Sequence, residues 1–166
     1  DGIGILKQGT DYADAISPSI GEFTNGVELV AGTMLRELCD ANDILLIFDE
    51  VITGLGRCGA YTGAEAFGVT PDILNLAKQI TNGAQPLGAV VSKQEIYDTY
   101  MDQGGPDYMV EFPHGYTYSA HPVACAAGLA ALDVLEREQL PQRVKAMSGY
   151  FEQAVHQLKG APYVED

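Results

Sequence analysis

Two residues have the type and position to do covalent chemistry: Asp49 and Lys78, which lie 29 residues apart. Lys78 directly follows the apolar segment Ile73–Ala77, where partial burial favours the neutral amine that forms a Schiff base. Asp49 ends the apolar run Ile44–Phe48, and a carboxylate at a buried strand end requires a cation or a hydrogen-bond donor. A bound cation is one such partner. Taken singly, each residue has an ordinary alternative, a capping or salt-bridged Asp and a solvated surface Lys.

The segments around these two residues predict an alternation of helices and strands. Ile44–Phe48 is a continuous apolar run, typical of a strand buried on both faces. Ile73–Ala77 and Leu87–Val91 predict two more strands, preceded by a short amphipathic helix over Met34–Ala41 and followed by a helix over Gln94–Met101.

Strands buried on both faces belong to parallel sheets covered by helices, which bind ligands beyond the carboxyl ends of the strands. The sequence therefore predicts an α/β fold with a mostly parallel sheet flanked by helices. Asp49 and Lys78 are expected at its ligand-binding edge.

Two helices are predicted after the sheet. One runs from Pro122 to about Glu138, is rich in Ala, Leu and Val, and is expected to be largely buried. Pro141 opens the other, and Gly160 is placed to end it. Its apolar residues are spaced to form one stripe that packs on another element: Val144, Met147, Phe151, Val155 and Leu158. Residues 1–33 show no clear periodicity, so no element is predicted there.

Composition is that of a globular chain of 166 residues, 46% hydrophobic and 19% charged. Its formal net charge of −14 disfavours nucleic acid and anionic membrane surfaces as partners. The cysteines Cys39, Cys58 and Cys125 are too far apart for a zinc motif or a disulfide framework, which indicates a reducing cytoplasm. The longest strongly apolar stretch, Pro122–Leu132, is too short to span a bilayer, and no targeting segment is recognisable.

Three motifs resemble the signature of the class III aminotransferases, enzymes of fold type I that use pyridoxal 5′-phosphate. They are FDEVITGLGR at Phe48–Arg57, PDIL at Pro71–Leu74 with Ala77-Lys78, and HGYTYSAHP at His114–Pro122. The interval from Asp49 to Lys78 also matches the family. EFPHG at Glu111–Gly115 and HPVACAAG at His121–Gly128 look most similar to the ω-amino acid (β-alanine):pyruvate aminotransferases.

The resemblance implies a role for four residues. Lys78 would form the internal aldimine with pyridoxal phosphate and then act as the general acid–base that moves the proton. Asp49 would bind the pyridine nitrogen. Val51, two residues further on the same strand face, would pack against the ring. Thr117 would bind the cofactor phosphate of a neighbouring subunit, which implies a homodimer with shared active sites.

The implied reaction moves an amino group from an ω-amino acid or amine, such as β-alanine, to pyruvate by a ping-pong route through pyridoxamine phosphate. Ile52 favours this pyruvate-linked branch, because enzymes for ornithine or γ-aminobutyrate usually have Gln at that position. The resemblance assigns residues 34–138 to part of the large, aspartate aminotransferase-like domain and 139–166 to the start of the C-terminal small domain. Residues 1–33 depart from the family pattern, either because they have diverged or because the reading frame is faulty there.

Residues next to these are expected to be structural. Glu50 would hold local backbone or a neighbouring loop, and Gly54, Gly56 and Gly59 would serve turns. His114 and His121 are seven residues apart without acidic partners, which favours a structural role over metal ligation.

Three other functions remain as alternatives. Family members are two to three times as long as this chain, so it could be a catalytically incomplete module that at most binds the cofactor or dimerises. It could also be another class III aminotransferase or an aminomutase. A generic nucleotide-binding domain is disfavoured, because neither glycine-rich phosphate-binding motif is present.

Overall fold

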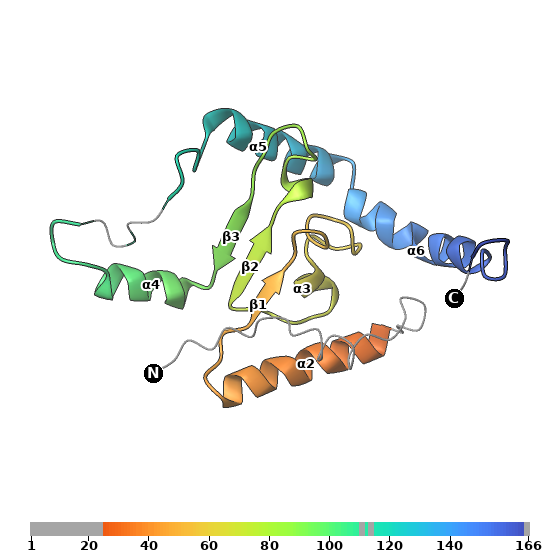
Figure 1. The fold of residues 1–166 in the computed structure, drawn as a ribbon, viewed down its shortest axis with the longest axis horizontal. Helices are drawn as coiled ribbons and strands as arrows, with labels where there is room; N and C mark the ends of the chain where they lie inside the picture. The colour runs from red at the N-terminus through yellow and green to blue at the C-terminus, as the bar shows by residue number, and fades with distance from the viewer. Residues whose placement is uncertain (1–24, 110–111, 113–114, 165–166) are drawn as a thin grey trace.

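The computed structural model describes residues 25–109, 112 and 115–164, with side chains described from residue 32 onward. Helices and strands alternate along the chain until two helices follow one another at its C-terminal end (Figure 1). The elements are α2 (Asn25–Ala41), β1 (Ile47–Asp49), α3 (Gly63–Ala66), β2 (Ile73–Leu76), the 3₁₀ helix η1 (Lys78–Ile80), β3 (Ala89–Ser92), α4 (Gln94–Gln103), α5 (Pro122–Arg137) and α6 (Leu140–His156).

The three strands form one sheet in the order β1-β2-β3. β1 and β2 are parallel, with Ile47 opposite Ile73 and Asp49 opposite Asn75. β2 and β3 are antiparallel, with Leu76 opposite Ala89. The α/β class is confirmed, and the mostly parallel sheet expected for the whole domain is represented here by one pairing of each kind.

A small core fixes α2 to the start of the sheet. Cys39 of α2, Leu46 just before β1, and Val69 are buried together. Leu35, Ile44 and Phe48 pack against them. α2 begins nine residues before the predicted helix at Met34, in a stretch where the sequence shows no clear periodicity. Helical structure there spreads from a packed amphipathic segment, since packing rather than propensity stabilises most helices.

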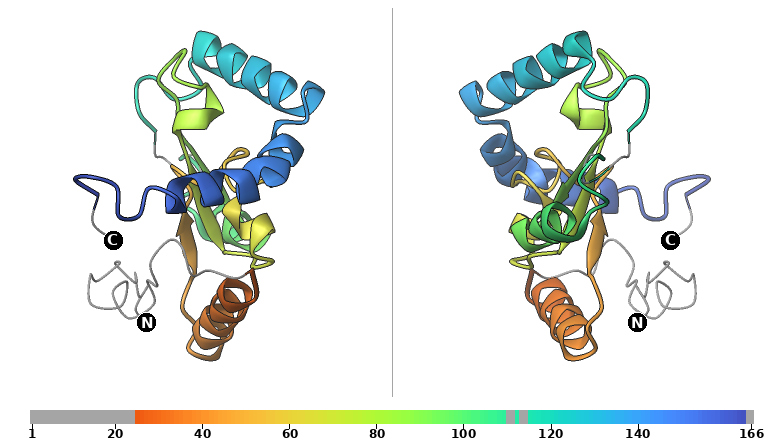
Figure 2. Two further views of the ribbon diagram at one scale, coloured as in Figure 1. Left: turned by 90° about the vertical axis from the view of Figure 1, so that its right-hand side faces the viewer. Right: turned by 90° about the vertical axis from the view of Figure 1, so that its left-hand side faces the viewer.

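Helices lie at both ends of the strands. α2 crosses near the amino ends of β1 and β2, whereas η1 and α5 lie near their carboxyl ends (Figures 1 and 2). The covering of the sheet faces is incomplete. The prediction that the first strand is buried on both faces is wrong, because Ile47 is 41% exposed and Leu45 is also exposed.

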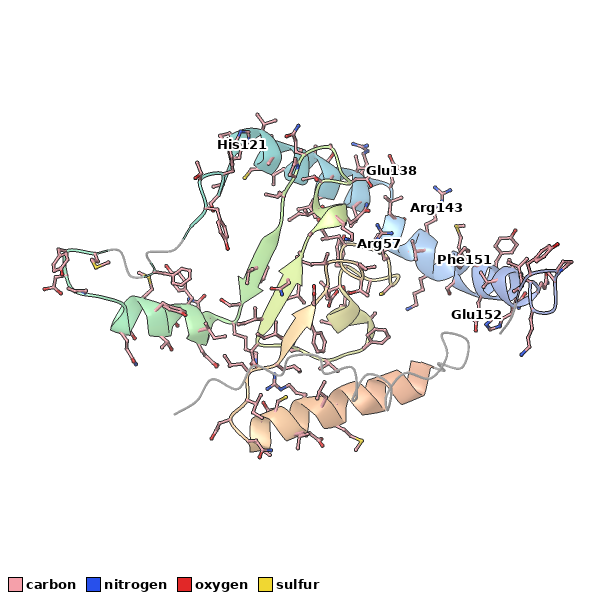
Figure 3. The ribbon with its side chains drawn as sticks, viewed as in Figure 1. Arg57, His121, Glu138, Arg143, Phe151 and Glu152 are labelled. Carbon is pink, nitrogen blue, oxygen red and sulfur yellow. The ribbon has the colours of Figure 1, made fainter. Side chains whose placement is uncertain are left out.

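The two C-terminal helices are less buried than predicted. In α5 only Ala124, Gly128 and Leu135 are buried, because the described residues supply few elements for this helix to pack on. The apolar stripe of α6 is exposed along most of its length, and Phe151 lies where α6 extends beyond the sheet (Figure 3). α6 ends at His156, four residues before Gly160. No helix among the described residues has the length and hydropathy needed to cross a membrane.

Candidate active site

Asp49 and Lys78 lie at the same edge of the sheet. Asp49 is the last residue of β1 and is in register with Asn75 of β2. Lys78 follows just beyond the end of β2, where η1 begins. Because β1 and β2 run parallel, their carboxyl ends meet at one edge. The structure thus places next to each other the ends of the two strands that the sequence predicted to hold the site.

The carboxylate of Asp49 is exposed and makes only a weak local contact. Its Oδ1 accepts a hydrogen bond of 3.3 Å from the Val51 N–H. Among the described residues no cation pairs with it. The prediction that Asp49 ends a dry strand is therefore wrong for this structure, since β1 is partly exposed. The carboxylate nonetheless remains available to a cationic ligand.

Lys78 is exposed and has a left-handed backbone. Its φ of 48° lies in a region that costs a residue with a side chain about 1–2 kcal/mol, and the preceding Ala77 is fully extended. The expected partial burial of Lys78 is wrong, because the residue has left the strand and lies in the turn beyond it. No carboxylate among the described residues forms an ion pair with its amine. The amine of Lys78 is thus exposed and uncommitted within the described part of the chain.

The turn that carries Lys78 is held on α5. Gly128 of α5 is buried, and a Cβ at that position would lie 3.4 Å from the Ile80 carbonyl oxygen and 3.2 Å from Leu87 Cδ2. The absence of a side chain lets η1 approach the helix closely. Thr81 closes the same turn by donating its hydroxyl to the Gln85 carbonyl.

Val51 lies outside the strand. β1 ends at Asp49, and Val51 begins a turn, half-buried. The argument that Val51 shares a strand face with Asp49 therefore fails, because alternation of side chains applies only to extended backbone. Its contact with a cofactor ring stays a prediction.

Thr117 is exposed in a turn ahead of α5. The turn is closed by two hydrogen bonds, from the Ser119 N–H to the Tyr116 carbonyl and from the Tyr116 N–H to the Ser119 hydroxyl. Among the described residues no hydrogen bond joins Thr117 to Asp49 or Lys78. Its phosphate-binding role also stays a prediction.

His121 has the structural role predicted for it. Its Nδ1 accepts a hydrogen bond of 3.4 Å from the Ala124 N–H and caps α5, whose start is labelled in Figure 3. His114 lies outside the described residues. Within the described part of the chain, no three His, Cys, Asp or Glu side chains are grouped to hold a metal ion.

Glu50 is buried directly beside Asp49. It is 3% exposed, and its carboxylate accepts hydrogen bonds from the Gly63 N–H, from the Ala64 N–H at 2.7 Å and from the Thr53 hydroxyl at 3.4 Å. These donors lie at the start of α3 and in the loop before it. The prediction that Glu50 holds a neighbouring loop is confirmed.

The glycines of the loop after Asp49 serve two purposes. Gly56 and Gly59 have φ of 104° and 77°, which confirms that they serve turns. Gly54 instead makes room, because a Cβ there would lie 2.6 Å from Leu76 Cδ2 and 2.9 Å from the Glu50 carbonyl oxygen.

A buried charge network at the amino end of the parallel strands was not predicted. Asp72 is 8% exposed and lies just before β2. Its Oδ2 accepts from Arg36 and from the Leu46 N–H, and its Oδ1 pairs with Lys93, each at 2.7 Å. The network joins α2, the start of β1 and the start of α4. The sequence feature that could have indicated this network is an acidic residue, Asp72, directly before an apolar strand.

Burial acts to raise the pKa of Asp72, but hydrogen bonds from Lys93, the Leu46 N–H and Arg36 outweigh it and lower that pKa to about 2. Burial likewise acts to lower the pKa of Arg36, and the hydrogen bonds to Asp72 and Asp40 outweigh it and raise that pKa. Both groups are therefore held in their charged forms.

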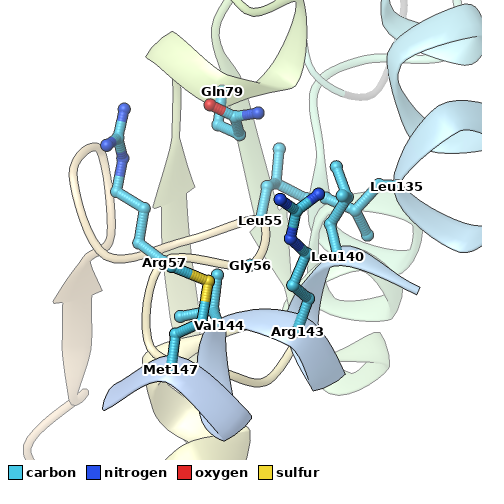
Figure 4. Close-up of a pocket in the computed structure, with 9 residues that line it drawn as sticks. All are labelled: Leu55, Gly56, Arg57, Gln79, Leu135, Leu140, Arg143, Val144 and Met147. Carbon is cyan, nitrogen blue, oxygen red and sulfur yellow. The ribbon is translucent and has the colours of Figure 1, made fainter. Parts of the chain in front are cut away.

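An open pocket of about 390 Å³ lies behind the Lys78 turn, between the glycine loop and the junction of α5 and α6. In Figure 4, Gln79 and Met147 lie on opposite sides of it. Its lining consists of Leu55, Gly56, Arg57, Gln79, Leu135, Leu140, Arg143, Val144 and Met147. Neither Asp49 nor Lys78 lines this pocket, so it is separate from the edge where the predicted chemistry lies.

Comparison with known proteins decides the family. Residues 21–166 match the profile of the family described as "Aminotransferase class-III". The chain belongs to this family. The matched region includes residues 21–33, ahead of the motifs that carry the resemblance.

Two curated aminotransferases illustrate the similarity. The chain is 63% identical over 132 residues to "Beta-alanine--pyruvate aminotransferase" of Pseudomonas aeruginosa, covering 80% of this chain and 30% of the relative. It is 61% identical over 131 residues to "Omega-amino acid--pyruvate aminotransferase" of Pseudomonas putida, covering 79% and 29%. The chain thus spans about 30% of the length of these relatives.

Solved transaminase structures share the fold. An (S)-enantioselective ω-transaminase from Thermomicrobium roseum matches with a TM-score of 0.73 and 42% identity, over 81% of this chain and 29% of that one. An amine transaminase from an uncultivated Pseudomonas species, solved with pyridoxal phosphate bound, matches with a TM-score of 0.64 and 52% identity, over 69% and 25%. The predicted fold type and cofactor are confirmed.

The residues at the carboxyl edge fit this cofactor. Asp49 presents an exposed carboxylate without a cationic partner among the described residues, which complements a protonated ring nitrogen. Lys78 presents an exposed amine without an acidic partner, which complements an aldehyde carbon. The two residues lie at or just beyond the carboxyl ends of adjacent parallel strands.

Proposed function

We propose that the protein carrying this chain transfers an amino group from an ω-amino acid or amine, such as β-alanine, to pyruvate. The names of two relatives at 63% and 61% identity support this substrate pair. The observation that carries the proposal is structural: Asp49 ends β1, Lys78 lies two residues beyond the end of the adjacent parallel strand β2, and neither forms an ion pair with a described residue.

When bound, pyridoxal phosphate supplies an electron sink for the electrons of a broken bond at the amino-bearing carbon. The carboxylate of Asp49 would hold the ring nitrogen in its protonated form. The amine of Lys78 would hold the cofactor between turnovers. During a turnover it would carry a proton between the amino-bearing carbon of the substrate and C4′ of the cofactor.

The remaining assignments complete the proposed site. Val51 would contact the ring from the turn after β1, and Thr117 would bind the phosphate of the cofactor in a second subunit. The active protein would then be a homodimer with shared sites. A cytoplasmic location is proposed from the odd number and wide spacing of Cys39, Cys58 and Cys125, which disfavour a disulfide framework.

A second candidate is a module that binds cofactor without turnover. The exposure of Lys78 and of the β1 face favours it for the 166 residues alone, because an uncovered site admits water and leaves charges weakly oriented. Other class III activities have less support, with 38% identity to a rice "Gamma-aminobutyrate transaminase 1, mitochondrial" as an example.

Borohydride trapping distinguishes these functions. The protein is incubated with pyridoxal phosphate, reduced with borohydride and mapped by peptide mass spectrometry. We expect label on Lys78, loss of the cofactor absorbance band in Lys78→Ala, and unchanged labelling in Lys145→Ala, which removes an exposed lysine of α6. Label without transfer of an amino group from β-alanine to pyruvate would favour the binding module. Label scattered over several lysines would contradict the assignment of Lys78.

A further inference from the structure

We propose that Glu50 is a positioning residue for Asp49: its buried carboxylate ties the end of β1 to the start of α3 and so fixes where the Asp49 carboxylate meets the ring nitrogen of the cofactor. The inference rests on the proposed function, because it gives Glu50 a task only if Asp49 binds that nitrogen.

The carboxylate of Glu50 is held by donors and not by a cation. Oε2 accepts from the Gly63 N–H and, at 3.4 Å, from the Thr53 hydroxyl, while Oε1 accepts from the Ala64 N–H at 2.7 Å. No ion pair reaches it from the described residues. A buried carboxylate without donors is costly, so these charge-assisted bonds hold the residue in one place.

The backbone of Glu50 is fixed as firmly as its side chain. Its N–H donates to the Asn75 carbonyl at 2.9 Å, which continues the pairing of β1 with β2 one residue beyond Asp49. Its carbonyl accepts from the Gly54 N–H at 3.0 Å. The Glu50 N–H belongs to the peptide that joins Asp49 to Glu50, so any displacement of Glu50 displaces Asp49.

The two neighbouring carboxylates face different surroundings. Asp49 is exposed, whereas Glu50 is buried, as expected where successive side chains point to opposite sides of extended backbone. The weak 3.3 Å contact with the Val51 N–H cannot by itself fix the Asp49 side chain. Its position therefore depends on the adjacent anchor.

Two glycines leave room for this anchor. A Cβ at Gly63 would lie 3.3 Å from Glu50 Oε2, and one at Gly54 would lie 2.9 Å from the Glu50 carbonyl oxygen. The loop from Asp49 to α3 is thus shaped around Glu50 at both of its ends. Larger residues at Gly54 or Gly63 would therefore displace Glu50.

The test compares Glu50→Gln with Asp72→Asn in the gene product at its full encoded length. Each variant neutralises a buried carboxylate, but Asp72 lies at the opposite, amino end of the parallel strands. Glutamine keeps one acceptor oxygen, and its amide nitrogen only donates, so one of the bonds from the Gly63 and Ala64 N–H groups is lost. Amide hydrogen exchange of these two residues reports the loss of the tether independently of the cofactor.

We expect Glu50→Gln to weaken affinity for pyridoxal phosphate about 10- to 100-fold, the effect that removing a group that orients a metal-binding side chain has on metal affinity. We also expect it to shift the pH midpoint of the cofactor absorbance band. Asp72→Asn should leave both within about twofold of the wild type. Glu50→Asp keeps the charge but is one methylene shorter, so it should give an intermediate effect and provides the measurement if Glu50→Gln does not fold.

Faster exchange at Gly63 and Ala64 with an unchanged affinity and band midpoint would show that Glu50 only stabilises the loop, and would overturn the inference alone. A wild-type protein that forms no band and takes no label at Lys78 would overturn the proposed function and this inference with it. The two failures are therefore distinguishable.

Discussion

The two ends of this sheet treat their charges in opposite ways. At the amino end, Asp72 is buried, and its carboxylate is held by Arg36, Lys93 and the Leu46 N–H. At the carboxyl end, Asp49 and Lys78 are exposed and form no ion pair with a described residue.

The difference separates structural charge from functional charge. A buried carboxylate held by several donors fixes the fold, whereas opposite charges left apart at one end of the sheet can bind a molecule that has both a cationic and an electrophilic atom. Asp49 and Asp72 both flank apolar strands, yet one is exposed and the other is buried in a charge network. An acidic residue next to an apolar strand therefore cannot be assigned a role from that position alone.

The largest expected effect is at the carboxyl end. In the full-length gene product, Asp49→Ala should lower kcat/KM for the β-alanine to pyruvate reaction about 100- to 1,000-fold, because it removes the charge that stabilises the ring cation. Some cofactor should stay bound through Lys78. Steady-state kinetics and the cofactor absorbance measure the two effects, with Asp133→Ala on the exposed surface of α5 as the control. An unchanged kcat/KM would show that the exposed carboxylate of Asp49 has no role in the reaction.

At the amino end, Asp72→Asn should lower the free energy of unfolding by about 3 kcal/mol, because Arg36 and Lys93 lose their common partner in a buried setting. Urea denaturation measures this. The matched variant Asp133→Asn breaks an exposed pair with Arg137 and should cost less than about 0.5 kcal/mol. Equal losses in the two variants would mean that burial does not distinguish the Asp72 network.

Acid should weaken the amino end in a defined range. The pKa of Asp72 is lowered from 3.8 to about 2 in the folded protein, so its contribution to stability is complete above about pH 4 and is lost as the pH falls toward 2. The loss is about 2 kcal/mol. Urea denaturation of the wild type at several pH values should show this slope, and Asp72→Asn should lack most of it. Parallel slopes would assign the acid sensitivity to other carboxyl groups.

The smallest effect concerns the backbone of Lys78. Lys78→Gly should raise the free energy of unfolding by about 0.5 kcal/mol, because glycine adopts the φ of 48° without steric cost although it gains entropy in the unfolded chain. Lys145→Gly, in the middle of α6, should instead lower it by about 1 kcal/mol. A loss of stability in Lys78→Gly would show that the lysine side chain stabilises the turn.

Local patterns were sufficient for most elements. The predicted strands at 73–77 and 87–91 are found as β2 and β3, and the predicted helices from Gln94, Pro122 and Pro141 begin within one residue of those positions. Periodicity and proline placement are properties of adjacent residues, so a single sequence contains them. The same patterns failed on burial, since Ile47 and Phe151 are apolar yet exposed.

The sequence by itself determined the family, the cofactor, and the placement of Asp49 and Lys78 at the ends of two apolar segments. Only the tertiary structure decided which carboxylates are satisfied. Asp72 meets partners 36 and 26 residues away, and Glu50 meets amides 13 and 14 residues away. A side chain's type gives its capacity for hydrogen bonding, but its partners are set by how distant segments pack, and that packing distinguishes Asp49 from the two acids that stabilise the fold.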